Sequence, residues 1–301
     1  MEHGIVPHLW FDKEAKEAAL FYTGLFPNSR ILDTVTLEDT PSGNAESVRF
    51  ELAGQPFQAI SAGPEFRFNS SISLMAVANT AEEVDRLYQA LIAGGSELMG
   101  LGEYPFSPRY AWIRDRYGLN WQLIQLDAQE EAGIRPTLMF AGDVCGRAEE
   151  AAEFYAGLFP QSAVGYVGRY APGQLERAEP KTAYMDFKLA GRTFCAMDHA
   201  MVEGDAFNEA FSLIVYCEDQ REIDDYWGKL SAVPEAEVCG WVKDRFGVSW
   251  QIVPRRMEDL LFSGSREQIA RVTQAMLRMK KLSIAELERA YWGEGMDGRH
   301  Q

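Results

Sequence analysis

Apolar residues recur along the chain with two different spacings, one typical of strands and the other typical of helices. Residues 5–11 form a short apolar run that predicts a strand. Asp12 is then expected to cap a helix, because apolar residues recur at helical spacing over residues 15–26 until Pro27 ends the pattern. Further runs that predict strands, joined by turns, lie at residues 31–38, 47–53 and 57–61. This segment therefore predicts a β-α-β-β-β unit.

The same order of elements follows directly. A strand predicted at residues 72–78 precedes Thr80-Ala81-Glu82-Glu83, which is the signature of a capping box at the start of a helix. The apolar face of this helix ends at Gly94-Gly95, and strands are predicted near residues 109–114 and 119–126. The pattern therefore predicts a second β-α-β-β-β-like unit.

Two long motifs then occur a second time. The segment FYTGLFPNS at residues 21–29 returns as FYAGLFPQS at residues 154–162. The segment DRYGLNWQ at residues 115–122 returns as DRFGVSWQ at residues 244–251. Because both motifs repeat at nearly the same interval, we expect one domain built twice, with four units in all. The expected division is a domain at residues 1–128, a second domain at 129–255 and a C-terminal helical extension at 256–301.

The expected extension has no counterpart in the first repeat. Ser265-Arg266-Glu267-Gln268 and Ser283-Ile284-Ala285-Glu286 each resemble a capping box, and an apolar stripe follows each of them. These patterns predict two helices that pack on the preceding domains or on a second subunit.

Composition and charge narrow the classes of partner. The formal net charge of −16 makes nucleic acid and anionic membrane surfaces poor partners, because both require clustered Lys and Arg. No apolar run is long enough to span a bilayer, and the first residues lack the pattern of a signal peptide. The cysteines all lie in the second repeat, which favours free thiols in a reducing cytoplasm: Cys145, Cys195, Cys217 and Cys239.

The two repeated motifs resemble those of a known family. The Phe-Tyr-x-Gly-Leu-Phe-Pro segment and the Asp-Arg-Phe/Tyr-Gly-x-x-Trp-Gln segment are similar to the PhnB-like branch of the vicinal oxygen chelate superfamily, which includes glyoxalase I, extradiol dioxygenases and bleomycin-binding proteins. Sequences of this branch often carry the name 3-demethylubiquinone-9 3-methyltransferase. The resemblance implies an α+β fold of two tandem glyoxalase-like domains, in which paired β-α-β-β-β units curl into a cup around a small molecule.

The resemblance also implies where a divalent metal would bind. Carried over onto this chain, the ligand positions of metal-using relatives fall on His8, Ser73 and Gln122 in the first repeat, and on Thr137, Ser212 and Gln251 in the second. Serine and threonine hydroxyls are weak ligands for divalent ions, whereas a stable site requires three or four good donors. We therefore expect no conventional metal triad, and the sequence leaves any cofactor open.

Other side chains could line a ligand pocket. If Trp121 and Trp250 pack outward under helices, the next residues, Gln122 and Gln251, point into the cups, because neighbouring strand residues face opposite sides. The full set of candidate ligand-binding residues is His8, Trp10, Tyr110, Trp112, Gln122, Gln251 and Trp241. The alternatives are that the amides bond only to facing protein groups and that the aromatic rings are ordinary core. Because the second repeat lacks the histidine and one tyrosine, we expect the cup of the first repeat to bind.

Several functions are compatible with this reading. The first hypothesis is a cytoplasmic protein that binds a small organic molecule, with catalysis left open. A second is a metal-dependent lyase, isomerase or oxygenase that uses His8 and Gln122, and a third is a non-enzymatic sequestering protein. A methyltransferase is disfavoured, because the Gly-x-Gly turn at residues 100–102 sits late in the domain and such a turn alone is a weak signal. The sequence leaves the oligomeric state open, with a homodimer as one possibility.

Overall fold

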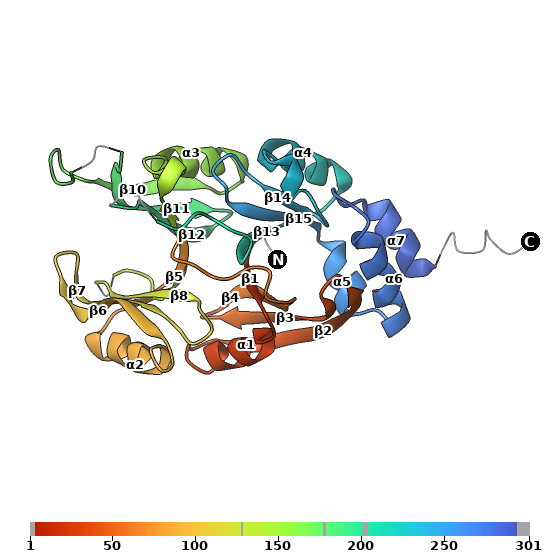
Figure 1. The fold of residues 1–301 in the computed structure, drawn as a ribbon, viewed down its shortest axis with the longest axis horizontal. Coiled ribbons are helices and arrows are strands. Elements are labelled where there is room, and N and C mark those ends of the chain that lie inside the picture. Colours follow the sequence, from red (N-terminus) through yellow and green to blue (C-terminus); the bar gives the residue numbers. More distant parts are fainter. Residues whose placement is uncertain (1–3, 128, 177–178, 201–203, 294–301) are drawn as a thin grey trace, which may run out of the picture.

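The computed structural model describes residues 4–127, 129–176, 179–200 and 204–293. The fold is α+β, with two sheets whose outer faces are covered by helices and a helical extension at the C-terminus (Figure 1). One sheet has seven strands in the order β14-β15-β13-β1-β4-β3-β2, and we call it cup A. The other has eight strands in the order β10-β11-β12-β9-β5-β8-β7-β6, and we call it cup B.

The elements follow the predicted succession of four units. The first unit contains β1 (Ile5–Phe11), α1 (Ala15–Thr23), β2 (Arg30–Thr40), β3 (Gly43–Leu52) and β4 (Gln55–Ser61). The second contains β5 (Ile72–Ala78), α2 (Ala81–Leu91), β6 (Ser96–Tyr104), β7 (Ser107–Arg114) and β8 (Asn120–Gln125). The third contains β9 (Gly133–Phe140), the short helix η1 (Gly142–Val144), α3 (Ala148–Leu158), β10 (Ala163–Arg169), β11 (Thr182–Leu189) and β12 (Arg192–Asp198). The fourth contains β13 (Phe211–Cys217), α4 (Gln220–Leu230), η2 (Pro234–Ala236), β14 (Trp241–Lys243) and β15 (Ser249–Pro254).

Each sheet takes one unit from each repeat. In cup A, β1 of the first unit pairs antiparallel with β13 of the fourth, so that Ile5 faces Val215 and His8 faces Ser212. In cup B, β5 of the second unit pairs antiparallel with β9 of the third. Within every unit the first and last strands pair in parallel. The two sequence repeats are therefore not two separate cups, because each cup is completed by strands of the other repeat.

Reciprocal hydrogen bonds tie the two repeats together near the centre. Asn69 Nδ2 donates to the Ala206 carbonyl at 2.9 Å, and Asn208 Nδ2 donates to the Arg67 carbonyl at 3.0 Å. The two bonds have the same pattern with the repeats exchanged. This exchange indicates that an approximate two-fold axis relates the two repeats.

A buried arginine also links the two sheets. Arg192, at the start of β12 in cup B, is 9% exposed. Its guanidinium donates to the Pro56 carbonyl at 3.0 Å and to Gln55 Oε1 at 3.0 Å, both at the start of β4 in cup A. Burial without a facing carboxylate lowers the pKa of Arg192 to about 9.

The two repeated sequence motifs meet in a buried network. In the first repeat, Asp115 Oδ2 accepts hydrogen bonds from Tyr22 Oη at 2.6 Å and from Trp121 Nε1 at 2.9 Å, while Asp115 Oδ1 accepts from two backbone N–H groups. Tyr22 comes from helix α1 and Trp121 from strand β8, so the carboxylate ties units one and two together. Asp244 makes the same bonds with Tyr155 and Trp250 in the second repeat.

Within its described residues, up to Gly293, the C-terminal extension contains three helices, one more than predicted: α5 (Arg256–Phe262), α6 (Arg266–Met276) and α7 (Ile284–Trp292). Ser265 and Gln268 form both arms of the predicted capping box, and Ser283 accepts a hydrogen bond from the Glu286 backbone. The apolar faces of these helices pack on β2 in one cluster with Val35 and Leu37. The helices therefore cover one end of cup A (Figure 1).

The expected cap of the first helix is wrong. The N-cap residue of α1 is Glu14, and no side chain caps the helix. The Ala15 N–H instead donates to Ser61 Oγ at 3.0 Å, so a residue distant in sequence satisfies one of the free N–H groups of the first turn.

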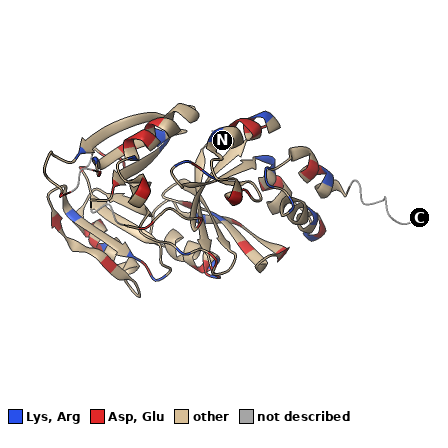
Figure 2. Cartoon of the chain, turned by 45° about the horizontal axis from the view of Figure 1, so that its top comes forward, with Lys and Arg blue, Asp and Glu red and all other residues tan. Residues whose placement is uncertain are grey.

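Charged residues of both signs occur along the described helices. Figure 2 shows acidic and basic residues interspersed over the helices rather than separated into a basic face. None of the helices formed by the described residues is long and apolar enough to cross a membrane.

The Asp115 network predicts a large effect on stability. Asp115→Ala leaves Tyr22, Trp121 and two backbone N–H groups without their acceptor in a buried site, so the free energy of unfolding should fall by about 3 kcal/mol. Urea denaturation followed by circular dichroism measures this change. Asp225→Ala, which removes an exposed pair with Lys229, is the matched control and should cost under about 1 kcal/mol. Equal losses in the two variants would contradict a structural role for the motif.

Candidate functional site

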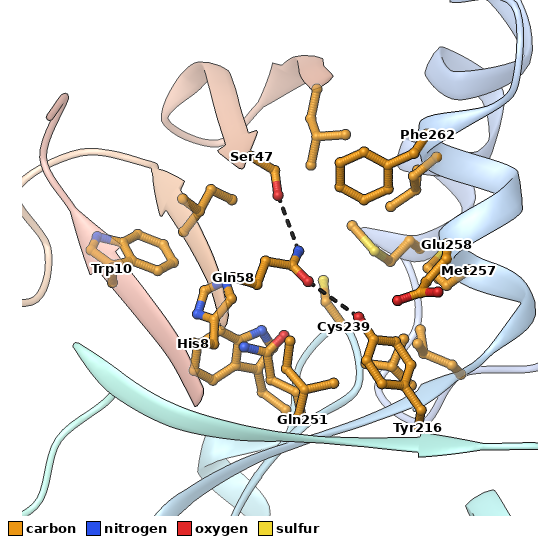
Figure 3. A pocket seen from close by; sticks show the side chains of 18 residues that line it. His8, Trp10, Ser47, Gln58, Tyr216, Cys239, Gln251, Met257, Glu258 and Phe262 are labelled. Carbon is orange, nitrogen blue, oxygen red and sulfur yellow. Dashed lines mark hydrogen bonds between the residues drawn. The ribbon is translucent and has the colours of Figure 1, made fainter. Parts of the chain in front are cut away.

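A cavity of about 120 Å³ lies inside cup A, between the inner face of the sheet and the C-terminal helices (Figure 3). Strands β1, β4, β13 and β15 supply its floor, and helices α5 and α6 supply part of its wall. Its side chains are mostly apolar, with a few polar groups among them. That make-up is typical of a site for a small organic molecule.

The polar group at the base of the cavity contains three residues from three strands. Gln251 Nε2 donates a hydrogen bond to Ser212 Oγ at 3.0 Å, and Ser212 Oγ lies 3.5 Å from His8 Nδ1. Trp250 points outward to the Asp244 network, so the alternation along β15 directs Gln251 inward. His8 and Ser212 meet because they are direct partners in the β1–β13 register.

A second polar group lies on the same inner face. Gln58 Nε2 donates to Ser47 Oγ at 3.0 Å, and Tyr216 Oη donates to Gln58 Oε1 at 3.2 Å. Gln58 is the register partner of His8 on β4. None of these three residues was among the candidates from the sequence. The four-unit pattern could have indicated Gln58. Strand β4 ends the first unit as β15 ends the fourth, so an inward residue of β4 is a candidate in the same way as Gln251.

Two tryptophans complete the aromatic wall. The Trp241 ring meets the His8 ring edge to face, with centroids 5.6 Å apart, and the Trp10 and Trp241 centroids are 6.3 Å apart. Trp10 Nε1 is fixed by the Gly63 carbonyl at 2.8 Å. The predicted residues His8, Trp10, Trp241 and Gln251 therefore share one cavity.

Burial controls the protonation of the histidine. His8 is 3% exposed, and desolvation lowers its pKa to about 3. The imidazole is therefore neutral at physiological pH. In that form one ring nitrogen can donate and the other can accept a hydrogen bond, but the imidazole is a weak base.

The remaining predicted residues lie in cup B, contrary to the expectation that His8 and Gln122 share a site. Gln122 Nε2 donates to Ser73 Oγ at 2.9 Å, and Gln122 Oε1 accepts from Tyr110 Oη at 2.8 Å. Trp112 packs beside Tyr110 in the same cluster. The expectation failed because the sheets are completed between the repeats, which places the first and last strands of one repeat in different cups.

The interior of cup B is filled by its own side chains. Tyr110, Met75, Val77, Ile124 and Cys195 form a buried cluster at its centre. Trp112 pairs with Gln122 in the same way that Trp241 pairs with Gln251, so Tyr110 corresponds to Cys239 in cup A. The Tyr110 ring thus fills cup B and bonds to its glutamine, whereas the smaller Cys239 side chain lines the open cavity of cup A.

The donors in cup A do not fit a divalent metal. The strand pairing regroups the positions that the family resemblance assigned to metal ligands. Cup A then holds His8, Ser212 and Gln251, and cup B holds Thr137, Ser73 and Gln122. Cup A thus offers one imidazole, one hydroxyl and one amide, and the hydroxyl and the amide are already bonded to each other. Within the ranges that the structure describes, no cluster of three or more His, Cys, Asp or Glu side chains could hold a metal.

The neutral His8 predicts a specific loss of stability in acid. The unfolded chain binds a proton at His8 near pH 6.5, whereas the folded chain does so only near pH 3. The folded state is therefore destabilised as the pH falls through this window, by about 3 kcal/mol between pH 7 and pH 4. Urea titrations of the wild type and His8→Gln at both pH values isolate this contribution, because the variant lacks it. Parallel pH dependences in the two proteins would contradict a buried neutral imidazole.

Comparisons with known proteins agree with this geometry. The family model described as 3-demethylubiquinone-9 3-methyltransferase matches twice, at residues 3–124 and 132–253. A PhnB protein from Bacillus cereus is 34% identical over 40% of this chain and 98% of its own, with a TM-score of 0.38. A search of curated proteins found no match.

Two solved structures of proteins longer than the PhnB protein resemble the fold over most of this chain. Glyoxalase I from Zea mays is 10% identical, covers 83% of this chain and 92% of its own, and has a TM-score of 0.53. A Bacillus subtilis protein proposed to be a dioxygenase is 12% identical, covers 96% of both chains and has a TM-score of 0.51. At these identities the likeness concerns the fold alone. The chain belongs to the 3-demethylubiquinone-9 3-methyltransferase family, the PhnB-like branch of the vicinal oxygen chelate superfamily.

Proposed function

We propose that this protein binds one small organic molecule per chain, in the cavity of cup A and without a bound metal. The observation that carries the proposal is the difference between two equivalent cups. Tyr110 fills cup B and bonds to Gln122, whereas Cys239 at the same position leaves space in front of Gln251. A well-packed interior needs no cavity, so the retained space in one cup points to a ligand.

The size of the cavity limits the ligand. A cavity of roughly 150 Å³ in another protein holds benzene, and the cavity of cup A measures about 120 Å³. A single ring with a short substituent matches this space. The rings of Trp10 and Trp241 would contact its faces, while Gln251 and His8 would meet its polar atom.

The geometry supports binding more directly than catalysis. The buried imidazole of His8 is too weakly basic to remove a proton efficiently near pH 7, because desolvation lowers its pKa to about 3. Burial also raises the pKa of Cys239, so its thiol is a poor nucleophile at neutral pH. Sequestration of a compound therefore suits these residues better than the methyl transfer in the family name, which needs a nucleotide-type cofactor site.

A matched pair of variants tests the proposal. Single-ring fragments are screened by ligand-observed NMR, and the affinity of the best fragment is measured by quenching of tryptophan fluorescence. We expect one site per chain, with Gln251→Leu weakening binding about tenfold through loss of the amide group. Gln122→Leu should leave the affinity unchanged while lowering the melting temperature, because Gln122 lies in the filled cup.

Two results would oppose the proposal. Two equal sites per chain would mean that cup B also binds, and a failure of every fragment to bind would mean that the cavity is not a ligand site.

A further inference from the structure

The cavity of cup A carries one charge that the sheets do not supply. Glu258, from helix α5 of the C-terminal extension, is the one charged residue among the described side chains that line it. Its carboxylate points toward Tyr216 and Gln58 across the cavity (Figure 3). No Lys or Arg side chain is found among these lining residues. A bound anion would therefore face a carboxylate, because the cation that pairs with Glu258, Arg49, is not among the lining residues.

The carboxylate is only partly neutralised by its neighbour. Arg49 Nη1 lies 3.0 Å from Glu258 Oε1, but the same guanidinium also pairs with Asp33 through Nη2. Two carboxylates thus share one cation, so Arg49 balances the charge of Glu258 only in part. Arg255, the other guanidinium near Tyr216, is paired with Glu218.

The uncharged polar groups favour the same kind of ligand. The amide nitrogens of Gln58 and Gln251 each donate to a serine hydroxyl, and the Tyr216 hydroxyl donates to Gln58. The hydrogen bonds of the described residues do not use Gln251 Oε1, which leaves an acceptor at the base of the cavity. The electron-rich faces of Trp241 and Trp10 add to the attraction for a cation.

Resting on the proposed function, we infer that the ligand of cup A is a small organic cation. Its protonated nitrogen binds the Glu258 carboxylate, and its apolar body lies against the tryptophan rings. Charge-assisted hydrogen bonds to a carboxylate are stronger than neutral ones, so this contact selects amines over alcohols and acids of the same shape. The C-terminal extension therefore determines the ligand class, although the sheets alone form the cup.

Three single-ring probes of similar size test this inference. Benzylamine is cationic at pH 7, benzyl alcohol is neutral and benzoate is anionic. Their dissociation constants are measured by tryptophan quenching at pH 7 in low salt. We expect the wild type to bind benzylamine about tenfold or more tightly than benzyl alcohol, and benzoate most weakly.

Variants then assign the preference to one carboxylate. Glu258→Gln should remove the preference for benzylamine while leaving the affinity for benzyl alcohol within about twofold, because the shape of the cavity is kept. Glu288→Gln is the matched control, since it changes a glutamate of the same extension that pairs with Arg256 on the surface. That variant should bind all three probes as the wild type does.

The possible failures are distinguishable. Equal binding of benzylamine and benzyl alcohol by the wild type overturns the cation inference and leaves the proposed function standing. An equal loss of affinity for every probe in Glu258→Gln also overturns it, because the carboxylate would then only hold the helix in place. If none of the three probes binds the wild type, the cation inference fails, whereas the proposed binding function fails only if the whole fragment screen also gives no binder.

Discussion

The pairing of β1 with β13 is the constraint on which the site depends. It is a junction between strands that begin about 200 residues apart, and it sets His8 opposite Ser212 in a fixed register. Without it, His8 and Gln251 would belong to different sheets, and the cavity between them would not exist. The reciprocal asparagine bonds and the buried Arg192 secure the same arrangement, because they hold cup A and cup B together at their common centre.

The approximate symmetry of the two cups makes their differences informative. Both cups keep an inward glutamine bonded to a serine from a neighbouring strand. They differ at several inward positions, among them Tyr110 against Cys239 and Val77 against Tyr216, and the interior of one is packed while the other holds a cavity. The C-terminal helices increase the asymmetry, since they wall the open cup and bring a carboxylate to its edge. The two repeats thus form two similar cup-shaped sheets. The interior of cup B is packed like a core, whereas cup A surrounds a cavity.

Local patterns predicted the elements and the inward glutamines, but not the partners of the strands. The strand alternation that puts Trp250 outward and Gln251 inward is a property of one segment, so the sequence alone was sufficient. The pattern of a single segment does not show whether a unit pairs with the other unit of its own repeat or with a unit of the other repeat. Both arrangements bury the same faces of the same strands. For that reason His8 was grouped with Gln122. Glu258 was missed for a related reason, since the packing of the extension on β2 is purely tertiary.

Most residues of the motifs that identify the family hold the fold together, and the exception is Gln251, the last residue of the second motif, which lines the cavity. Asp115 and Asp244 each bind a tyrosine from a helix, a tryptophan from a strand and two backbone N–H groups, and no acceptor capacity is left facing a cavity. These networks pack a helix against a sheet in both repeats, whatever the adjoining cup contains. On the proposed function, Gln251 of the motif lies at the base of the cavity, whereas residues outside the motifs, such as Cys239 and Glu258, determine which ligand binds there.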